Sequence, residues 1–278
     1  MSPSSDILDR MTTTPLDDSI PRPRIPVLFA HEQVAEPQLA SPSASKPRDV
    51  VLRWQQRGYP IDLLRPQPAE PEDLYRAHDR TYVDAVLECR ELNGFGNRSA
   101  SVAASLPWTS GSMLSAARHA LAGGGVACAP CSGFHHAHWD AAAGFCTFNG
   151  LMVTVLALRA GDGARRIGIL DCDQHYGDGT EDIIVRRRMH DGVRHVTAGR
   201  DYPRHAARFL ASLPGIVRSF ADCDLMLYQA GADPHVDDPL GGYLDDEQLA
   251  RRDAIVFGEA CAMGLPVAWN LAGGYQEP

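Results

Sequence analysis

The sequence predicts an α/β fold of three layers, in which a mainly parallel central sheet is covered by helices on both faces. Two observations carry this prediction. Short apolar runs rich in β-branched residues alternate with longer stretches of helical periodicity from about residue 25 onward, as strands joined by crossover helices do. Four of these runs are followed directly by clusters of chemically reactive residues, which is expected where parallel strands end at one edge of a sheet.

The strands are predicted from runs that are apolar on both faces, as in a sheet covered on both sides. In chain order they are 25–30, 126–130, 167–173, 195–198, 225–230 and 266–271. Helices are predicted where apolar residues recur at helical spacing between the strands. They are 72–92, 112–122, 151–160, 180–188, 203–213 and 247–263. Residues 1–22 are rich in Ser, Thr, Pro and Asp, so we expect a flexible leader followed by one domain over 23–278.

The charge balance disfavours a general nucleic-acid binder. The 278 residues include 26 Lys plus Arg against 35 Asp plus Glu, a formal net charge of −9, which offers no overall positive field to a phosphate backbone. The chain has no long apolar run, and its N-terminal stretch lacks the basic-then-apolar order of a secretory signal. We therefore expect a cytoplasmic protein with neither a membrane nor a nucleic-acid partner.

The seven cysteines do not form the pattern of a disulfide framework, because their number is odd and they are scattered. Cys128 and Cys131 have the C-x-x-C spacing of a redox or metal site, but no second C-x-x-C follows. We expect mostly buried free thiols.

One polar cluster has the spacing of a metal site. Residues two apart in an extended segment point to the same side, so Asp171, Asp173 and His175 would share one face where a strand ends. Burying such groups together is costly without a cation, and three protein ligands with an open position describe a catalytic metal site. Asp233 follows another strand at a matching place. These ligands suit Zn²⁺, Fe²⁺ or Co²⁺, whereas the alternative is a hydrogen-bonded strand end without metal.

The other clusters hold candidates for proton transfer and carbonyl polarisation. His135 and His136 could take a proton from a metal-bound water if Asp171 and Asp178 set their tautomers. Tyr275 follows two glycines and could donate a hydrogen bond to a developing oxyanion. Taken singly, each could equally be an ordinary core or surface residue.

The ordered motifs GFHHAHWDAAAGFCTFN, ILDCDQHYGDGT, QAGADPHVDDPLGG and NLAGGY resemble those of the zinc-dependent histone deacetylase family. This family also includes acetylpolyamine amidohydrolases and acetoin-utilisation proteins, and the likeness is to its bacterial-type members. The segment AHDRTYVDAV at 77–86 is similar to an early helix of the family. The likeness extends over roughly residues 25–275.

The resemblance implies an arginase-like α/β fold and a role for each matching residue. It makes Asp173, His175 and Asp233 the metal ligands. It makes His135 and His136 the catalytic histidines, oriented by Asp171 and Asp178, and Tyr275 the carbonyl polariser. Phe134, Gly144, Phe145 and Tyr202 would line a narrow substrate tunnel. A structural potassium ion would lie near Asp171 and His175.

The implied activity is zinc-dependent removal of acetyl or other acyl groups from lysine-like amines. An acetylated polyamine or another small amide is an alternative substrate to an acetylated lysine. Two other classes stay open, namely a non-catalytic acyl-lysine-binding module and an arginase-like ureohydrolase with two manganese ions. Because the family continues beyond its tyrosine motif and this chain ends at Pro278, we expect the last strand and Tyr275 to lack cover and a homodimer to be plausible.

Overall fold

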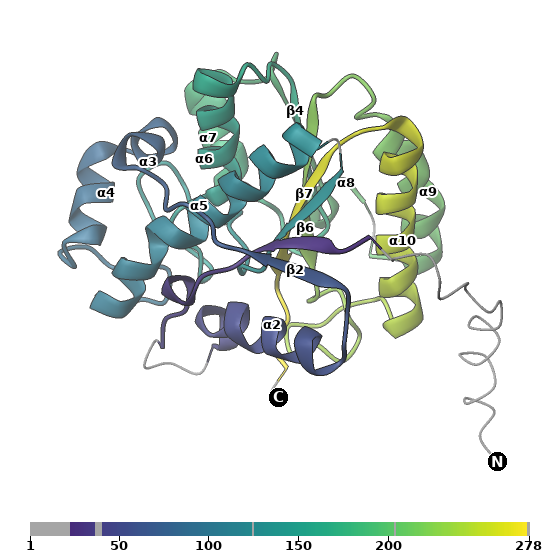
Figure 1. The fold of residues 1–278 in the computed structure, drawn as a ribbon, viewed down its shortest axis with the longest axis horizontal. Helices are drawn as coiled ribbons and strands as arrows, with labels where there is room; N and C mark the ends of the chain where they lie inside the picture. The colour runs from purple at the N-terminus through teal and green to yellow at the C-terminus, as the bar shows by residue number, and fades with distance from the viewer. Residues whose placement is uncertain (1–22, 37–40, 124, 203, 277–278) are drawn as a thin grey trace.

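The computed structural model describes residues 23–36, 41–123, 125–202 and 204–276. Within these ranges, seven strands form one sheet in the order β2-β1-β3-β7-β6-β4-β5, and every neighbouring pair is parallel (Figure 1). The strands are β1 (Ile25–Leu28), β2 (Ile61–Leu64), β3 (Val126–Ala129), β4 (Ile167–Asp171), β5 (Val193–Thr197), β6 (Leu225–Gly231) and β7 (Val267–Ala272). The predicted fold class is confirmed, whereas the predicted leader at 1–22 lies outside the described residues.

Helices cover both faces of the sheet. One face carries α3 (Pro71–Ala77), α4 (Arg80–Leu87), α5 (Ala100–Gly123), α6 (Gly150–Ala157) and α7 (Asp178–Arg187). The other carries α2 (Lys46–Gln56), α9 (Ala206–Arg218) and α10 (Asp246–Met263). Short helical turns complete the chain: η1 (His31–Gln33), η2 (Pro42–Ala44), the π-helical turn η3 (Leu158–Asp162) and α8 (Ala198–Asp201). Figure 1 shows the two groups of helices on opposite sides of the strands.

The central strands are buried on both faces, which explains their apolar runs. All five residues of β4 and all seven of β6 are buried. Side chains alternate between the two core layers, so Ile169 packs with the α5 and α6 side and Leu170 packs with the α9 and α10 side. This burial keeps the carboxyl ends of the strands in fixed register beneath the loops that follow them.

Several predicted boundaries were wrong for identifiable reasons. The helix expected at 72–92 is two helices, because Asp79 begins α4 by accepting a hydrogen bond from the Tyr82 N–H at 3.1 Å. The helix expected at 112–122 begins at Ala100 and contains Pro107. The strand predicted at 167–173 ends at Asp171, after which the chain turns. Neither α2 nor β2 was predicted, since α2 is mostly polar and β2 has only four residues.

The last strand is well covered, contrary to the sequence-based expectation. β7 lies between β3 and β6, and Val267 and Ala268 are fully buried. Trp269 packs against Trp54 of α2 and Phe257 of α10, with ring centroids 6.0 and 5.7 Å apart. The expected exposure of apolar surface at β7 was therefore wrong. Among the described helices, none combines the length and apolar content needed to cross a membrane.

Candidate active site

The loops that carry the candidate residues all leave the carboxyl edge of the sheet. His136 lies on the segment after β3, His175 on the loop after β4, Asp233 after β6 and Tyr275 after β7. Because β3, β7, β6 and β4 are neighbours in the sheet, these loops meet above its centre. The four polar clusters of the sequence thus share one edge.

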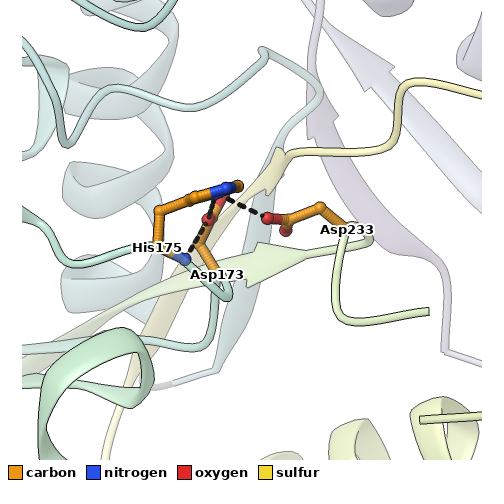
Figure 2. A group of neighbouring side chains, drawn as sticks. All are labelled: Asp173, His175 and Asp233. Atoms are coloured by element: carbon orange, nitrogen blue, oxygen red, sulfur yellow. Dashed lines mark hydrogen bonds and ion pairs between the residues drawn. The ribbon is translucent and has the colours of Figure 1, made fainter. Parts of the chain in front are cut away.

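Asp173, His175 and Asp233 converge on one point (Figure 2). The Nδ1 atom of His175 lies 2.9 Å from Oδ1 of Asp173 and 2.9 Å from Oδ2 of Asp233. One ligand atom from each side chain falls within 4.8 Å of the others. Among the described residues this is the one such group of His, Cys, Asp and Glu.

The geometry and chemistry of this group fit a divalent cation. Oδ1 of Asp233 is buried and has no hydrogen-bond partner in the described part of the chain, so a carboxylate oxygen is left to bind another group. Ligand atoms around a tetrahedral ion with bonds near 2 Å are about 3.3 Å apart, close to the spacing of His175 Nδ1 from both carboxylates. One nitrogen and two oxygen donors suit Zn²⁺, Fe²⁺ or Co²⁺.

The charges within the group perturb one another strongly. Hydrogen bonds to Asp173 and Asp233 raise the pKa of His175 to about 10. Burial raises the pKa of Asp233 above its usual value. Burial also opposes ionisation of Asp173, but the His135 and His175 imidazoles outweigh it and lower its pKa.

Asp171 orients His135 and stands apart from the converging group. Its Oδ2 lies 2.7 Å from Nδ1 of His135, and its Oδ1 accepts from the Gln229 amide at 3.1 Å and from the Asp173 N–H at 3.1 Å. The spacing argument had placed Asp171 on one face with Asp173 and His175, which was wrong because the chain turns after β4. Burial lowers the pKa of His135, but Asp171 and Asp173 outweigh it and raise the pKa to about 9.

His136 is paired with Asp178 in the same way. Nδ1 of His136 lies 2.7 Å from Oδ1 of Asp178, the first residue of α7. Burial and the neighbouring His135 lower the pKa of His136, although Asp178 opposes this shift. The two adjacent imidazoles therefore have pKa values shifted in opposite directions, as is common for an acid and a base in one site. The His136 side chain is 21% exposed, so it is reachable from outside.

Tyr275 is half-buried beside the converging group. Its backbone N–H donates to Oδ2 of Asp238 at 2.9 Å, and its ring centroid lies 5.6 Å from that of Phe145. Burial and the charge of Asp173 raise the pKa of the Tyr275 hydroxyl, which keeps its proton available for donation. The expected lack of cover for Tyr275 is thus contradicted by its burial.

The tunnel candidates occupy different environments. Gly144 has a φ of +51°, and a Cβ there would lie 2.5 Å from Cδ2 of His136. Phe145 is 38% exposed, whereas Phe134 is buried, and both line one pocket. Tyr202 packs its ring against Phe209 with centroids 6.1 Å apart. The structure thus brings Gly144 and Phe145 beside His136 and Tyr275, and the tunnel itself stays a prediction.

Several residues at this edge carried no recognisable signal in the sequence. Lys46 is half-buried, and its Nζ donates to the Gly273 carbonyl and lies 3.4 Å from Ser132 Oγ. Burial lowers the pKa of Lys46 to about 8, although Asp173 and Asp233 oppose this shift. Arg252 of α10 reaches the same edge from behind the sheet. Asp238 lies in the motif QAGADPHVDDPLGG, but the sequence indicated no role for it.

The cysteines behave as expected. Every cysteine is free, and five of the seven are buried. Cys131 Sγ accepts a hydrogen bond from the Gln33 amide at 3.1 Å, and burial raises the pKa of both Cys128 and Cys131. Cys128 and Cys131 are therefore buried core residues despite their C-x-x-C spacing.

A parallel sheet with this ligand group at its carboxyl edge, next to two imidazoles that each bond a carboxylate, defines the class of α/β metal-dependent hydrolases. Sequence comparison specifies the class further. The pattern of the histone deacetylase domain matches residues 45–208, more than half of the chain. The chain belongs to the histone deacetylase family.

Individual relatives agree with this assignment. An uncharacterized protein of Picosynechococcus is 30% identical over 253 residues, covering 77% of this chain and 83% of its own. A probable deacetylase of Methanothermobacter thermautotrophicus is 28% identical, covering 51% of this chain and 50% of its own. An acetylpolyamine amidohydrolase of Burkholderia pseudomallei is 40% identical, covering 29% and 24% respectively. The latter two are thus matched over half of their length or less.

A solved structure supports the fold alone. The HD domain of HDA15 superposes with a TM-score of 0.74 and covers 91% of this chain and 85% of its own, at 19% identity. The three-layer fold is therefore shared with the HD domain of HDA15.

Proposed function

We propose that this protein is a metal-dependent amide hydrolase that removes acetyl groups from lysine-like amines. One observation carries the proposal: the convergence of Asp173, His175 and Asp233 lies at the same sheet edge as the Asp178-bonded His136 and the half-buried Tyr275. A ligand group, a proton carrier and a hydroxyl donor are together sufficient for metal-assisted hydrolysis of an amide.

The ligand group would hold the ion. Asp173, His175 and Asp233 supply the donor atoms, with Zn²⁺ as the first candidate and Fe²⁺ or Co²⁺ as alternatives. A bound ion supplies Lewis-acid polarisation and lowers the pKa of water from 15.7 toward about 7. A potassium ion near Asp171 and His175 stays a prediction of the family resemblance.

His136 would act as the proton carrier. With Nδ1 donating to Asp178, the neutral ring leaves Nε2 free to accept a proton from the attacking water. The lowered pKa of His136 favours this neutral form. The same nitrogen then delivers the proton to the leaving amine, which departs as the amide bond breaks.

His135 and Tyr275 would stabilise negative charge. The raised pKa of His135 favours its charged form, held in place by Asp171. The Tyr275 hydroxyl would donate to the carbonyl oxygen as it gains charge, a contribution of about 3–4 kcal/mol for a well-placed donor. Phe134, Gly144, Phe145 and Tyr202 would shape the approach of the acyl-bearing chain.

The substrate is an acetylated amine, for which two sources compete. An acetylated lysine in a peptide is one source. An acetylated polyamine is the other, and it is favoured by the similarity of this chain to acetylpolyamine amidohydrolases of Burkholderia pseudomallei and Pseudomonas aeruginosa. Both present an aliphatic chain that ends in an amide.

The test is turnover by the full chain reconstituted with Zn²⁺, measured on a panel of acetyl-lysine peptides and acetylated polyamines with and without a chelator. We expect chelator-sensitive acetate release, with the preferred panel member identifying the substrate class. Binding of acetylated ligands without acetate release would instead indicate an acyl-lysine-binding module and would overturn the proposal. Chelator-insensitive release would overturn the metal requirement.

Three broader expectations stay predictions. They are a single catalytic domain over 23–278, a cytoplasmic location and a homodimer. Light scattering of the purified chain would test the dimer, because it measures molar mass in solution directly.

A further inference from the structure

Arg252 is a buried cation that joins the ends of two strands. It lies on α10, and the residue is only 2% exposed. Its guanidinium donates to the carbonyl of Gly231 at the end of β6 and lies 3.4 Å from the carbonyl of Cys172, just beyond β4. Both contacts are made by Nη1, while Nε bonds Asp253 on the helix. A lysine has only one terminal nitrogen, so it could not contact both strand ends and stay bonded to Asp253 in the same way.

Both carbonyls belong to the segments that carry the candidate ligands. Cys172 immediately precedes Asp173, and Gly231 comes two residues before Asp233. The two segments are closely packed, since a Cβ on Gly231 would lie 2.5 Å from the Asp173 Cα. Their relative position therefore sets how far apart the two carboxylates are.

The β4–β6 ladder stops short of these ligands. Its last paired residues are Asp171 and Gln229, followed by one further bond from the Cys172 N–H to the Gln229 carbonyl at 3.0 Å. The guanidinium of Arg252 provides a connection between the segments beyond that point.

Arg252 is itself held on α10. Its Nε donates to Oδ1 of Asp253 at 2.9 Å, and the same oxygen accepts from the Tyr228 hydroxyl at 2.5 Å. The guanidinium carbon lies 6.0 Å from the centre of the Tyr228 ring. Although burial opposes its charge, Tyr228 and Asp253 keep the pKa of Arg252 above its usual value. A permanent positive charge thus lies behind the two acidic ligands.

We propose that Arg252 is a positioning residue that fixes the separation of Asp173 and Asp233 and thereby sets the affinity of the site for its divalent ion. This inference rests on the metal site of the proposed function. Groups that orient metal ligands from outside typically change metal affinity by about 10- to 100-fold when they are replaced. A purely structural role would instead lower the stability of the protein and leave the affinity of the folded protein unchanged.

The experiment measures Zn²⁺ affinity of the full chain by competition with a chromophoric chelator. The variants are Arg252→Gln and Arg252→Lys, with Arg251→Gln as the matched control, because Arg251 is an exposed neighbour and its replacement removes the same charge. We expect Zn²⁺ affinity to fall about 10- to 100-fold in Arg252→Gln and measurably in Arg252→Lys, and to stay unchanged in Arg251→Gln. The visible spectrum of the Co²⁺-loaded protein should change in both Arg252 variants.

Thermal unfolding with excess chelator measures the structural contribution separately. Zn²⁺ affinity within twofold of the unaltered protein in folded Arg252→Gln would overturn the inference. If Arg252→Gln does not fold, the Zn²⁺ affinity of Arg252→Lys is compared with that of the unaltered protein, and a difference within twofold would again overturn the inference. Absence of Zn²⁺ and Co²⁺ binding by the unaltered protein would overturn both this inference and the proposed metal site. Normal metal binding without amide hydrolysis would overturn only the proposed activity. The Zn²⁺ affinity of the Arg252 variants would still decide whether Arg252 positions the ligands.

Discussion

Asp238 accepts a hydrogen bond from the backbone N–H of Tyr275 at 2.9 Å, which joins the loop after β6 to the turn after β7. The other oxygen of Asp238 accepts from the Leu240 N–H at 2.9 Å, and the residue is only 5% exposed. The carboxylate is therefore fixed within its own loop before it contacts Tyr275. Tyr275 owes its position to a neighbouring loop as well as to its own strand.

This relationship predicts that Asp238→Ala lowers kcat by about tenfold, part of the loss of about 10²–10³ expected for removing an oxyanion donor outright. The reason is that the hydroxyl of Tyr275 would no longer be held at one position. In a Tyr275→Phe background the same substitution should cost little, because the two changes act through one group. Asp237→Ala is the control, since the Asp237 side chain is 78% exposed. Additive losses in the double variant would contradict the assignment.

Replacing the reacting groups should cost far more. We expect His136→Ala and Tyr275→Phe each to lower deacetylation by about 10²–10³-fold while metal content, measured by elemental analysis, is retained. Neither side chain belongs to the ligand group. The exposed His190 provides a control through His190→Ala, which should leave turnover unchanged. Near-normal turnover in either active-site variant would refute the assigned roles.

Gly144 offers a steric test of the position of His136. A Cβ at residue 144 would lie 2.5 Å from Cδ2 of the imidazole, and the φ of +51° disfavours any side chain. Gly144→Ala should therefore displace His136 from Asp178 and lower kcat strongly, with a small change in metal affinity. Gly161→Ala is the control, because a Cβ there meets open space. Steady-state kinetics and Zn²⁺ titration distinguish this outcome from a general loss of structure.

The sequence predicted the parts of this site that depend on local spacing or on strand ends. Asp173 and His175 are two residues apart, so they stay close in any extended loop. Asp233 joins them because parallel strands end at one edge. Spacing alone placed Asp171 on one face with Asp173 and His175, whereas its contact with His135 agrees with the expectation that spare carboxylates orient the two histidines.

Contacts made from other layers could not be predicted in this way. Arg251 and Arg252 are adjacent residues of the same type, yet Arg251 is exposed and Arg252 is buried against two strand ends. Their difference is set by how α10 packs on β6, which is a tertiary property. Lys46 lies on a helix that the apolar pattern did not reveal. Residues that contact a site from another layer of the fold can therefore be identified only from the structure.

His78 predicts a pH-dependent stability. Its Nδ1 donates to the His138 carbonyl at 2.9 Å and its Nε2 accepts from the Asn149 N–H at 2.8 Å. Because one ring nitrogen donates and the other accepts, the buried imidazole is neutral. The two partners are the ends of the segment that carries Gly144. Burial lowers the pKa of His78 to about 4. As the pH falls below the unfolded value of about 6.5, the unfolded chain takes up a proton that the folded protein refuses, so stability decreases with falling pH.

The expected loss is about 2 kcal/mol of unfolding free energy between about pH 7.5 and about pH 5. Urea unfolding across this range measures it, and His78→Gln isolates the contribution of this residue, because other groups titrate equally in both proteins. The variant is expected to be less stable at neutral pH and to show a shallower decline. Parallel stability curves for the two proteins would show that His78 is not held neutral, since the proton difference between folded and unfolded states is what separates them.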